Sequence, residues 1–343
     1  MRRLDFARGA IRNETFPREG AVPEAHRRGH GEHVLAVVSD RSAPARSAVA
    51  ASWVRSAAWY GLDPEDRRGP RILTTGELSQ ARDRIAPLLD VAQASLDRLF
   101  LAIGSSGCCV LFTDLEGVPV DRRGVAADDE TFHRWGLWTG AVWSEEAEGT
   151  NGIGTCLAEE RLLTIHRDQH FHARNTALSC TVAPIFDHRG RLAAALDVSS
   201  CRADLTEGFV GLIAAAVADA ARRIEAENFR RAFPSARLVL AGDSERRGGL
   251  LAVDRDDLVI GATRAARLAY GLTDARLGAP LLVDSLLFPE ADRREALSDV
   301  ERSGLQRALA RTSGNVSAAA KVLGISRATM HRKLARFGLQ RRH

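Results

Sequence analysis

Histidine and cysteine residues near the middle of the chain are the first whose types suggest chemistry. His166, His170 and His172 are closely spaced, and Cys156 and Cys180 lie on either side of them. Imidazole and thiolate groups suit zinc or iron, and on a strand His170 and His172 would share one face. Loop histidines and buried free cysteines are the more common case. We therefore assign no metal ligand and keep a metal- or redox-sensing site as an alternative.

An enzyme with Cys156 or Cys180 as nucleophile beside a histidine is a second alternative. A nucleophile also needs an orienting third group and an oxyanion site, and no signature of either is present. The five cysteines contain no CxxC pair, and their odd number argues against a disulfide framework. Nothing near the adjacent Cys108 and Cys109 indicates an activated thiol. We expect neither an enzyme nor a cofactor.

Lysine is almost missing from the chain, which contains only Lys321 and Lys333. A P-loop requires Gly-Lys-Ser/Thr to contact nucleotide phosphates, and these two lysines follow Ala320 and Arg332. The strand lysine of a protein kinase is equally missing before Lys321. Composition therefore argues against a P-loop ATPase and against a kinase.

Three tryptophans precede a glycine-rich segment that could bind a small molecule. Gly149, Gly152 and Gly154 have the wrong order for a dinucleotide fingerprint and lack the preceding strand. The segment either closes over a core or walls an apolar pocket that has a few polar groups. The residues expected to bind a small organic effector are Trp135, Trp138, Trp143, Gly149, Thr150, Asn151, Gly152, Ile153, Gly154 and Cys180.

Positive charge is concentrated at the end of the chain. Residues 302–343 hold ten basic and no acidic side chains, so the remaining 38 basic and 44 acidic residues give residues 1–301 a net charge of −6. This asymmetry favours a polyanionic partner.

The basic segment has the pattern of a helix-turn-helix. We expect helices over residues 295–311, 316–323 and 327–337, with Asn315 and Ser326 as N-caps and Gly324 in the turn. Arg332, Lys333 and Arg336 are expected to contact phosphates, whereas Arg327, Ala328 and Thr329 would approach base edges. The full expected DNA-binding set is Asn315, Ser326, Arg327, Ala328, Thr329, His331, Arg332, Lys333 and Arg336.

The elements that position these residues indicate a multidomain protein. Residues 1–46 lack periodicity and are expected to be a mobile leader. Helical periodicity from Ser47, a second helix over residues 85–101 and strands over 108–113, 181–186 and 191–198 predict an α+β domain, an antiparallel sheet flanked by helices. The domains expected after the leader are a sensory domain at 47–202, a connecting helix at 203–235, a small α+β unit at 236–290 and an all-α DNA-binding domain at 292–343.

The connecting helix leaves one question open. Its apolar stripe of Phe209, Leu212, Ile213, Ala216 and Ile224 is compatible with a dimer seam or with packing on its own domain. No stretch is long and apolar enough for a transmembrane helix, so we expect a cytoplasmic protein with no membrane contact.

Two segments carry a resemblance to a known family. The sequence Gly-Asn-Val-Ser-Ala-Ala-Ala-Lys-Val-Leu-Gly-Ile-Ser-Arg-Ala-Thr-Met-His-Arg-Lys-Leu at 314–334 resembles the Fis-type helix-turn-helix of bacterial enhancer-binding regulators, with Met330 and His331 where Leu and Tyr are common. Residues 143–155, 165–172, 179–184 and 196–199 resemble the GAF sensory domain of the acetoin-catabolism regulator family.

The resemblance implies a function, and this sequence departs from the family pattern in one respect. In that family the GAF domain receives a signal, the helix-turn-helix binds DNA, and an AAA+ ATPase domain between them drives sigma-54 polymerase. Here residues 236–290 look like a shortened PAS-like unit, and neither a Walker A lysine nor a Gly-Ala-Phe-Thr-Gly-Ala loop is present. The resemblance therefore implies a homodimeric transcription regulator that binds an inverted repeat in double-stranded DNA and senses a small organic effector without ATP hydrolysis. RNA polymerase or a complete sigma-54 activator is the candidate protein partner.

Overall fold

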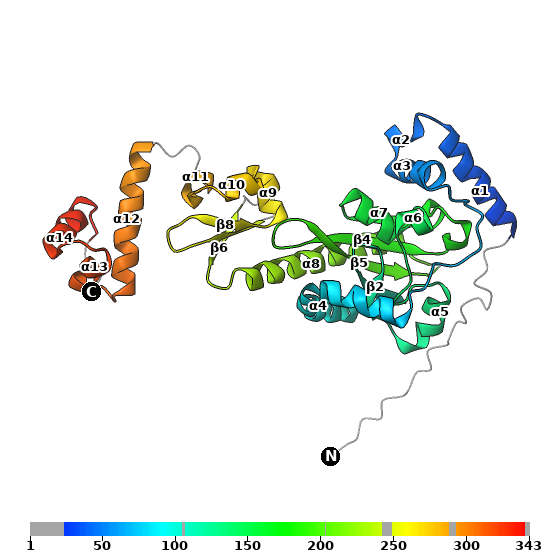
Figure 1. The fold of residues 1–343 in the computed structure, drawn as a ribbon, viewed down its shortest axis with the longest axis horizontal. Helices are drawn as coiled ribbons and strands as arrows, with labels where there is room; N and C mark the ends of the chain where they lie inside the picture. The colour runs from blue at the N-terminus through cyan, green and yellow to red at the C-terminus, as the bar shows by residue number, and fades with distance from the viewer. Residues whose placement is uncertain (1–23, 105–106, 203, 242–248, 288–292, 340–343) are drawn as a thin grey trace, which may run out of the picture. The chain divides into compact units, whose positions relative to one another are not determined.

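The computed structural model describes residues 24–104, 107–202, 204–241, 249–287 and 293–339. The chain divides into two compact units, residues 1–279 and 280–343 (Figure 1). No helix in the described ranges combines the length and apolar character needed to cross a membrane.

A five-stranded antiparallel sheet forms the body of the first unit (Figure 1). Its strands are β1 (Cys108–Thr113), β2 (Pro119–Arg123), β3 (Leu163–His166), β4 (Ser179–Phe186) and β5 (Leu192–Ser200). Their spatial order is β2-β1-β5-β4-β3. β4 and β5 form the predicted hairpin, in which Val182 pairs with Asp197. Gly190 adopts a φ of +75° in the turn between them, a conformation that glycine tolerates best.

Two long helices cover one face of this sheet. α4 (Thr75–Ile103) begins with a capping box between Thr74 and Glu77. α8 (Glu207–Ala232) begins at Thr206, whose side chain accepts a hydrogen bond from the amide of Phe209. Both helices pack against each other and share one buried apolar cluster with alternate residues of β1, β4 and β5.

The packing of α8 answers the question that its sequence leaves open. Ile213, Val217 and Ile224 are buried in the cluster shared with α4 and the sheet. Leu212, by contrast, is 68% exposed. The apolar stripe is therefore largely used within its own unit, and the interpretation of the whole stripe as a dimer seam is wrong.

The opposite face of the sheet, which we call the inner face, is covered by shorter segments. It bears Cys109, Leu111, Cys180 and Val182. α5 (Asp129–Arg134) and α7 (Gly152–Glu159) contribute buried residues to the same cluster. Shorter helices in this region are α6 (Glu145–Glu148) and the 3-10 helices Ala126–Asp128, Arg167–Gln169 and Ala173–Asn175.

The predicted mobile leader is wrong for residues 24–46. These residues form α1 (Glu24–Ser39) and α2 (Ala43–Arg46), which precede α3 (Ala48–Val54) and a π-helix at Arg55–Trp59. Val34 of α1 is buried in a cluster with Trp53 and Phe171. Glycines and charged residues hide the short apolar face of α1 from a periodicity search, and tertiary packing stabilises the helix. Residues 1–23 lie outside the described ranges.

A smaller sheet follows α8 in the first unit. It consists of β6 (Arg237–Ala241), β7 (Gly249–Val253) and β8 (Val259–Ala262), in that order, all antiparallel. α9 (Arg264–Tyr270) follows and ends at Gly271, which has a φ of +60°. α10 (Asp274–Leu277) completes this α+β part, whereas α11 (Val283–Leu287) belongs to the second unit. The predicted boundary after residue 290 therefore differs from the observed division.

The second unit ends in three helices, α12 (Arg293–Arg311), α13 (Val316–Val322) and α14 (Arg327–Arg336). Leu305, Ala319, Met330 and Leu334 are buried in their shared core. Small alanines on α13 allow α12 and α14 to pack closely against α13. The three helices agree with the sequence prediction to within two residues at each described end.

Candidate sensory site and DNA interface

The three tryptophans of the expected effector site have different environments. Trp143 is buried in the inner-face cluster, and its Nε1 donates a 2.8 Å hydrogen bond to the carbonyl of Gly136. Trp138 is half-buried, and the guanidinium of Arg122 lies 4.1 Å from the centre of its ring. Trp135 packs at the edge of the inner-face cluster. Trp143 is therefore a core residue with a satisfied donor, while a ligand contact by the three tryptophans stays a prediction.

The glycine-rich segment is packed tightly against the sheet. A Cβ atom on Gly152 would lie 2.5 Å from Cβ of Cys180, and one on Gly154 would lie 2.3 Å from the backbone nitrogen of Glu145. Asn151 caps α7, because its side-chain oxygen accepts a hydrogen bond from the amide of Gly154. The glycines thus allow close backbone approach. The segment closes over the core, and its role in binding stays a prediction.

The structure brings Cys180 and His170 together but leaves both unsuited to nucleophilic chemistry. Sγ of Cys180 lies 3.6 Å from Nε2 of His170, and both side chains are buried. Burial raises the pKa of the Cys180 thiol far above its usual range and lowers the pKa of His170 to about 4. A thiolate–imidazolium pair requires the opposite shifts. The contact therefore gives the enzymatic alternative no support.

The remaining candidates for a metal site are separated. His166 contacts Ser179 through Nδ1 at 2.9 Å, and His172 is buried with a pKa that desolvation lowers to about 3. Burial raises the pKa of the Cys156 thiol. Within the described ranges, no three histidine, cysteine or acidic side chains are grouped closely enough to hold a metal ion.

Asp197 is a buried polar residue of the inner face that sequence reasoning missed. Ser199 donates a 2.7 Å hydrogen bond to its Oδ2, and no group in the described chain is bonded to its Oδ1. Burial raises the pKa of Asp197 to about 7. The available signal was an acidic residue inside the apolar run at 192–198, which predicts a paired or functional carboxyl rather than a solvated one.

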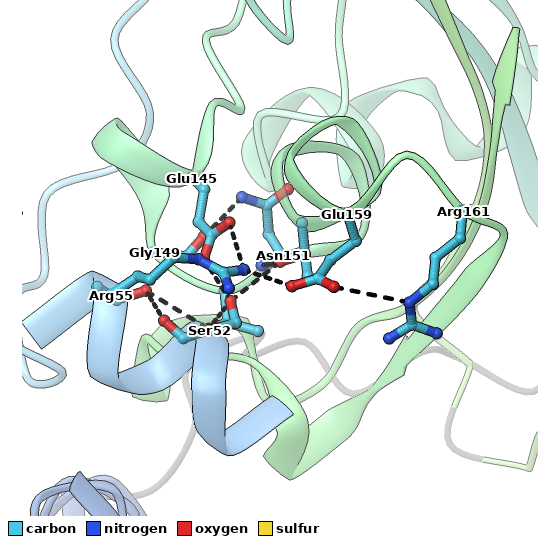
Figure 2. Close-up of polar contacts among 10 residues, drawn as sticks. Ser52, Arg55, Glu145, Gly149, Asn151, Glu159 and Arg161 are labelled. Carbon is cyan, nitrogen blue, oxygen red and sulfur yellow. Dashed lines mark hydrogen bonds and ion pairs between the residues drawn. The ribbon is translucent and has the colours of Figure 1, made fainter. Parts of the chain in front are cut away.

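The N-terminal helices are connected to the segment before α7 by a buried polar network (Figure 2). Arg55 forms ion pairs with Glu145 at 3.0 Å and with Glu159 at 2.9 Å. Ser52 lies 2.7 Å from Oγ1 of Thr150 and donates a hydrogen bond to Glu145. Figure 2 shows these side chains converging between the π-helix region and α7. The sequence analysis identified none of Ser52, Arg55 and Glu145.

A second set of contacts connects α1 and α3 with the chain before β4. Nε2 of His30 lies 3.0 Å from the carbonyl oxygen of His170, and Nε1 of Trp53 donates to the carbonyl of Gln169 at 2.9 Å. Desolvation lowers the pKa of His30, which keeps it neutral in this contact. Residues 24–60 therefore act as a structural part of the sensory domain.

The second unit has the local geometry of a DNA-binding helix-turn-helix. The side chain of Asn315 accepts hydrogen bonds from the amides of Ser317 and Ala318, and that of Ser326 accepts one from the amide of Thr329. Gly324 has a φ of +65° in the turn between α13 and α14. Both predicted caps and the predicted turn are confirmed. Asn315 and Ser326 thus have structural roles that account for their residue types without a DNA contact.

The basic side chains of α14 divide into two groups. Arg327, His331 and Arg332 are exposed, as is Ala328, while Thr329 is half-buried and lies 2.9 Å from the Ser326 hydroxyl through Oγ1. Lys333 forms an ion pair with Glu301 of α12, and Nη1 of Arg336 lies 3.9 Å from the same carboxylate. Glu301 immediately precedes the acid-free segment, so a charge count that starts at residue 302 misses this pairing.

Comparisons with known families agree with these two architectures. Residues 87–224 match the family described as GAF domain, and residues 296–337 match the family described as bacterial regulatory protein, Fis family. The chain is 39% identical over 197 residues to the acetoin catabolism regulatory protein of Cupriavidus necator. The aligned residues make up 57% of this chain and 29% of that protein.

Further similarities are weaker. The acetoin dehydrogenase operon transcriptional activator AcoR of Bacillus subtilis is 32% identical over 52% of this chain and 29% of its own length. The chain thus spans less than a third of each of these two relatives. A crystal structure of the E. coli DhaR(N)-DhaL complex covers 74% of this chain and 86% of that chain, with 18% identity and a TM-score of 0.47. The chain therefore combines a GAF domain with a Fis-type helix-turn-helix domain and is similar over about half of its length to two proteins named as regulators of acetoin metabolism.

Proposed function

We propose that this protein is a bacterial transcription regulator that binds double-stranded DNA through α14 and senses a small organic effector through its GAF domain. The observation that carries the proposal is the capped helix-turn-helix, whose second helix exposes Arg327, His331 and Arg332. A helix of this kind can enter the major groove, where arginines reach base edges and phosphates.

The effector proposal rests on the relatives and on the sensory fold. The names of the two relatives refer to acetoin catabolism and to an acetoin dehydrogenase operon. We infer that the effector of this protein is a small uncharged hydroxyketone or a close chemical relative. Since its proposed partner is DNA, we also propose that the protein acts in the bacterial cytoplasm, at the nucleoid when it is bound.

The mode of action follows from the lysine count. No lysine precedes Lys321, so these residues supply no P-loop for ATP hydrolysis. We propose action through DNA occupancy and through contact with RNA polymerase or a complete sigma-54 activator. A homodimer would place two copies of α14 about 34–36 Å apart, or a multiple of it, on an inverted repeat.

Fluorescence anisotropy with labelled DNA tests the DNA-binding proposal. We expect binding to a genomic fragment upstream of a regulated operon to exceed binding to shuffled DNA, and to weaken steeply as salt rises. Arg332→Ala should weaken binding to all sequences, because an exposed arginine contacts phosphates. Arg327→Ala should relax specificity, with a cost of about 1–3 kcal/mol on the preferred site.

Lys333→Ala is the matched control for this experiment. Because Lys333 is partly buried and paired with Glu301, its loss should reduce affinity less than the loss of Arg332. Equal binding of the wild-type protein to operon and shuffled DNA at physiological salt would contradict a sequence-specific regulator.

A further inference from the structure

Asp197 occupies an unusual position for an acidic side chain. It lies on β5, the central strand of the sheet, and pairs across the backbone with Leu111 of β1 and Val182 of β4. Paired residues of neighbouring strands point to the same face, and both partners belong to the apolar cluster of the inner face. The carboxyl group is therefore in the middle of an apolar layer, where the exposed fraction of Asp197 is 0%.

The hydrogen bonds of this carboxyl are incomplete. Ser199 is bonded to Oδ2, while Oδ1 is buried and lacks a partner in the described chain. Burial and the Ser199 bond are the two influences on the pKa of Asp197, and no basic side chain contributes. Buried polar oxygens in native proteins nearly always have a partner, because an unpaired one costs free energy. The described residues thus leave a hydrogen-bonding position at Oδ1 that a bound hydroxyl group could fill.

The surroundings define the chemistry of that donor. Burial, and next the charge of Asp197, raise the pKa values of the Cys109, Cys156 and Cys180 thiols. These thiols come from β1, α7 and β4 and belong to the same inner-face cluster, to which they contribute small, weakly polar groups. No basic side chain influences the pKa of Asp197 itself, which disfavours an anionic group at Oδ1. The described thiols are not grouped closely enough to hold a metal.

We propose that Oδ1 of Asp197 accepts a hydrogen bond from the hydroxyl group of a small uncharged effector that binds on the inner face between β5 and α7. This assignment rests on the proposed sensory function and makes Asp197 the residue that selects for a hydroxyl. The apolar side chains of the same cluster contact the carbon skeleton of the effector. Asp197 is thus the central residue of the proposed site, and the glycine-rich segment covers the bound effector.

The same carboxyl is connected to the N-terminal helices. The Ser199 hydroxyl lies 3.1 Å from Sγ of Cys180, which lies 3.6 Å from the His170 ring. The backbone carbonyl of His170 in turn contacts His30 of α1. A series of hydrogen bonds therefore connects the Asp197 carboxyl with α1. Through these contacts, binding of a hydroxyl at Asp197 can affect the position of the N-terminal helices.

The test compares two probes on the full chain. 3-Hydroxybutan-2-one carries the hydroxyl and butan-2-one lacks it, while the carbon skeleton is the same. Binding is measured by isothermal titration calorimetry and by the fluorescence of Trp143, which belongs to the inner-face cluster. We expect the wild-type protein to bind the hydroxyketone at least about tenfold more tightly, since a hydrogen bond to a buried oxygen that otherwise lacks a partner contributes about 1–3 kcal/mol.

Two variants make the assignment specific. Asp197→Leu has a similar shape but no hydrogen-bond acceptor, and we expect it to lose most of the preference between the two probes. Glu225→Gln is the matched control, because Glu225 is also a buried carboxyl whose pKa burial raises to about 7. Its carboxylate accepts a hydrogen bond from the amide of Phe186 and lies on α8, away from the inner face. This control should retain the full preference.

Each outcome decides the proposal. It is overturned if the wild-type protein binds both probes equally or binds neither, and also if folded Asp197→Leu, checked by circular dichroism, keeps the preference. DNA binding without a probe is measured in parallel, so a failure of the regulator function is distinguishable from a failure of the Asp197 site.

Discussion

At the scale of single residues, buried titratable groups determine how stability depends on pH. Burial raises the pKa of Asp197 to about 7 and lowers the pKa values of His170 and His172 to about 4 and about 3. The carboxyl binds its proton more tightly in the folded state, so its contribution to stability is complete below about pH 4 and is lost as pH rises through about 7. The histidines act in the opposite direction, because they bind a proton more tightly when unfolded.

These opposing contributions make a difference measurement necessary. We expect Asp197→Asn to gain stability relative to the wild-type protein as pH rises from 5 to 8, by an amount on the order of 2–4 kcal/mol. Urea unfolding monitored by tryptophan fluorescence at several pH values measures this difference. A difference between the two proteins that stays constant from pH 5 to pH 8 would show that the carboxyl is ionised at all these values.

Sequence reasoning identified residues whose role is local. Asn315 and Ser326 were predicted as caps because a cap depends on its own residue type and the next three residues. Asp197, Arg55 and Glu301 were missed because their roles depend on partners that are distant in sequence or lie across a sheet. An acidic residue in an apolar strand was visible at position 197, but its neighbours become known only from the strand register.

At the scale of elements, the same limit separates predicted from unpredicted structure. The hairpin of β4 and β5 and the long α8 have strong periodic patterns and were predicted. The short strands β2 and β3 lack such a pattern: β2 ends in the charged, half-buried run Asp-Arg-Arg, and β3 has only four residues. α1 was missed for a related reason, since it is stabilised by Trp53 and Phe171 rather than by its own composition.

The contact between the N-terminal helices and the sensory domain depends on one buried ion pair. Glu145 is almost fully buried and is paired with Arg55, which also contacts Glu159. Removing Arg55 would leave a buried carboxylate without its partner, so we expect Arg55→Ala to lower the free energy of unfolding by about 3–5 kcal/mol. Urea unfolding of the full chain measures this loss.

An exposed arginine is the control for that experiment. Arg68 pairs with Asp66, but its side chain is 89% exposed. Arg68→Ala should therefore change stability by less than about 1 kcal/mol. Similar losses for both arginine variants would show that the Arg55 pair does not fasten the N-terminal helices to the domain.

At the scale of the whole molecule, the net charge of +4 is the sum of an acidic body and a basic end. Ten basic side chains follow residue 301, but the structure shows that they are not equally available. Glu301 pairs with Lys333 and lies 3.9 Å from Arg336. This single carboxylate therefore lowers the positive charge that α14 presents to DNA.

Replacing Glu301 tests whether this pairing restrains DNA binding. In Glu301→Gln, Lys333 and Arg336 become free to contact phosphates, so affinity for all DNA sequences should rise at low salt. The slope of the logarithm of the DNA association constant against the logarithm of the salt concentration should become steeper by about 1–2. Each additional phosphate contact adds about 0.9 to this slope. Anisotropy titrations between 50 and 300 mM salt on operon and shuffled DNA measure both quantities. Because phosphate contacts carry no sequence information, the affinity ratio between the two DNAs should stay the same. An unchanged slope would mean that Lys333 and Arg336 do not reach the phosphates, and that Arg327 and Arg332 supply the affinity of α14.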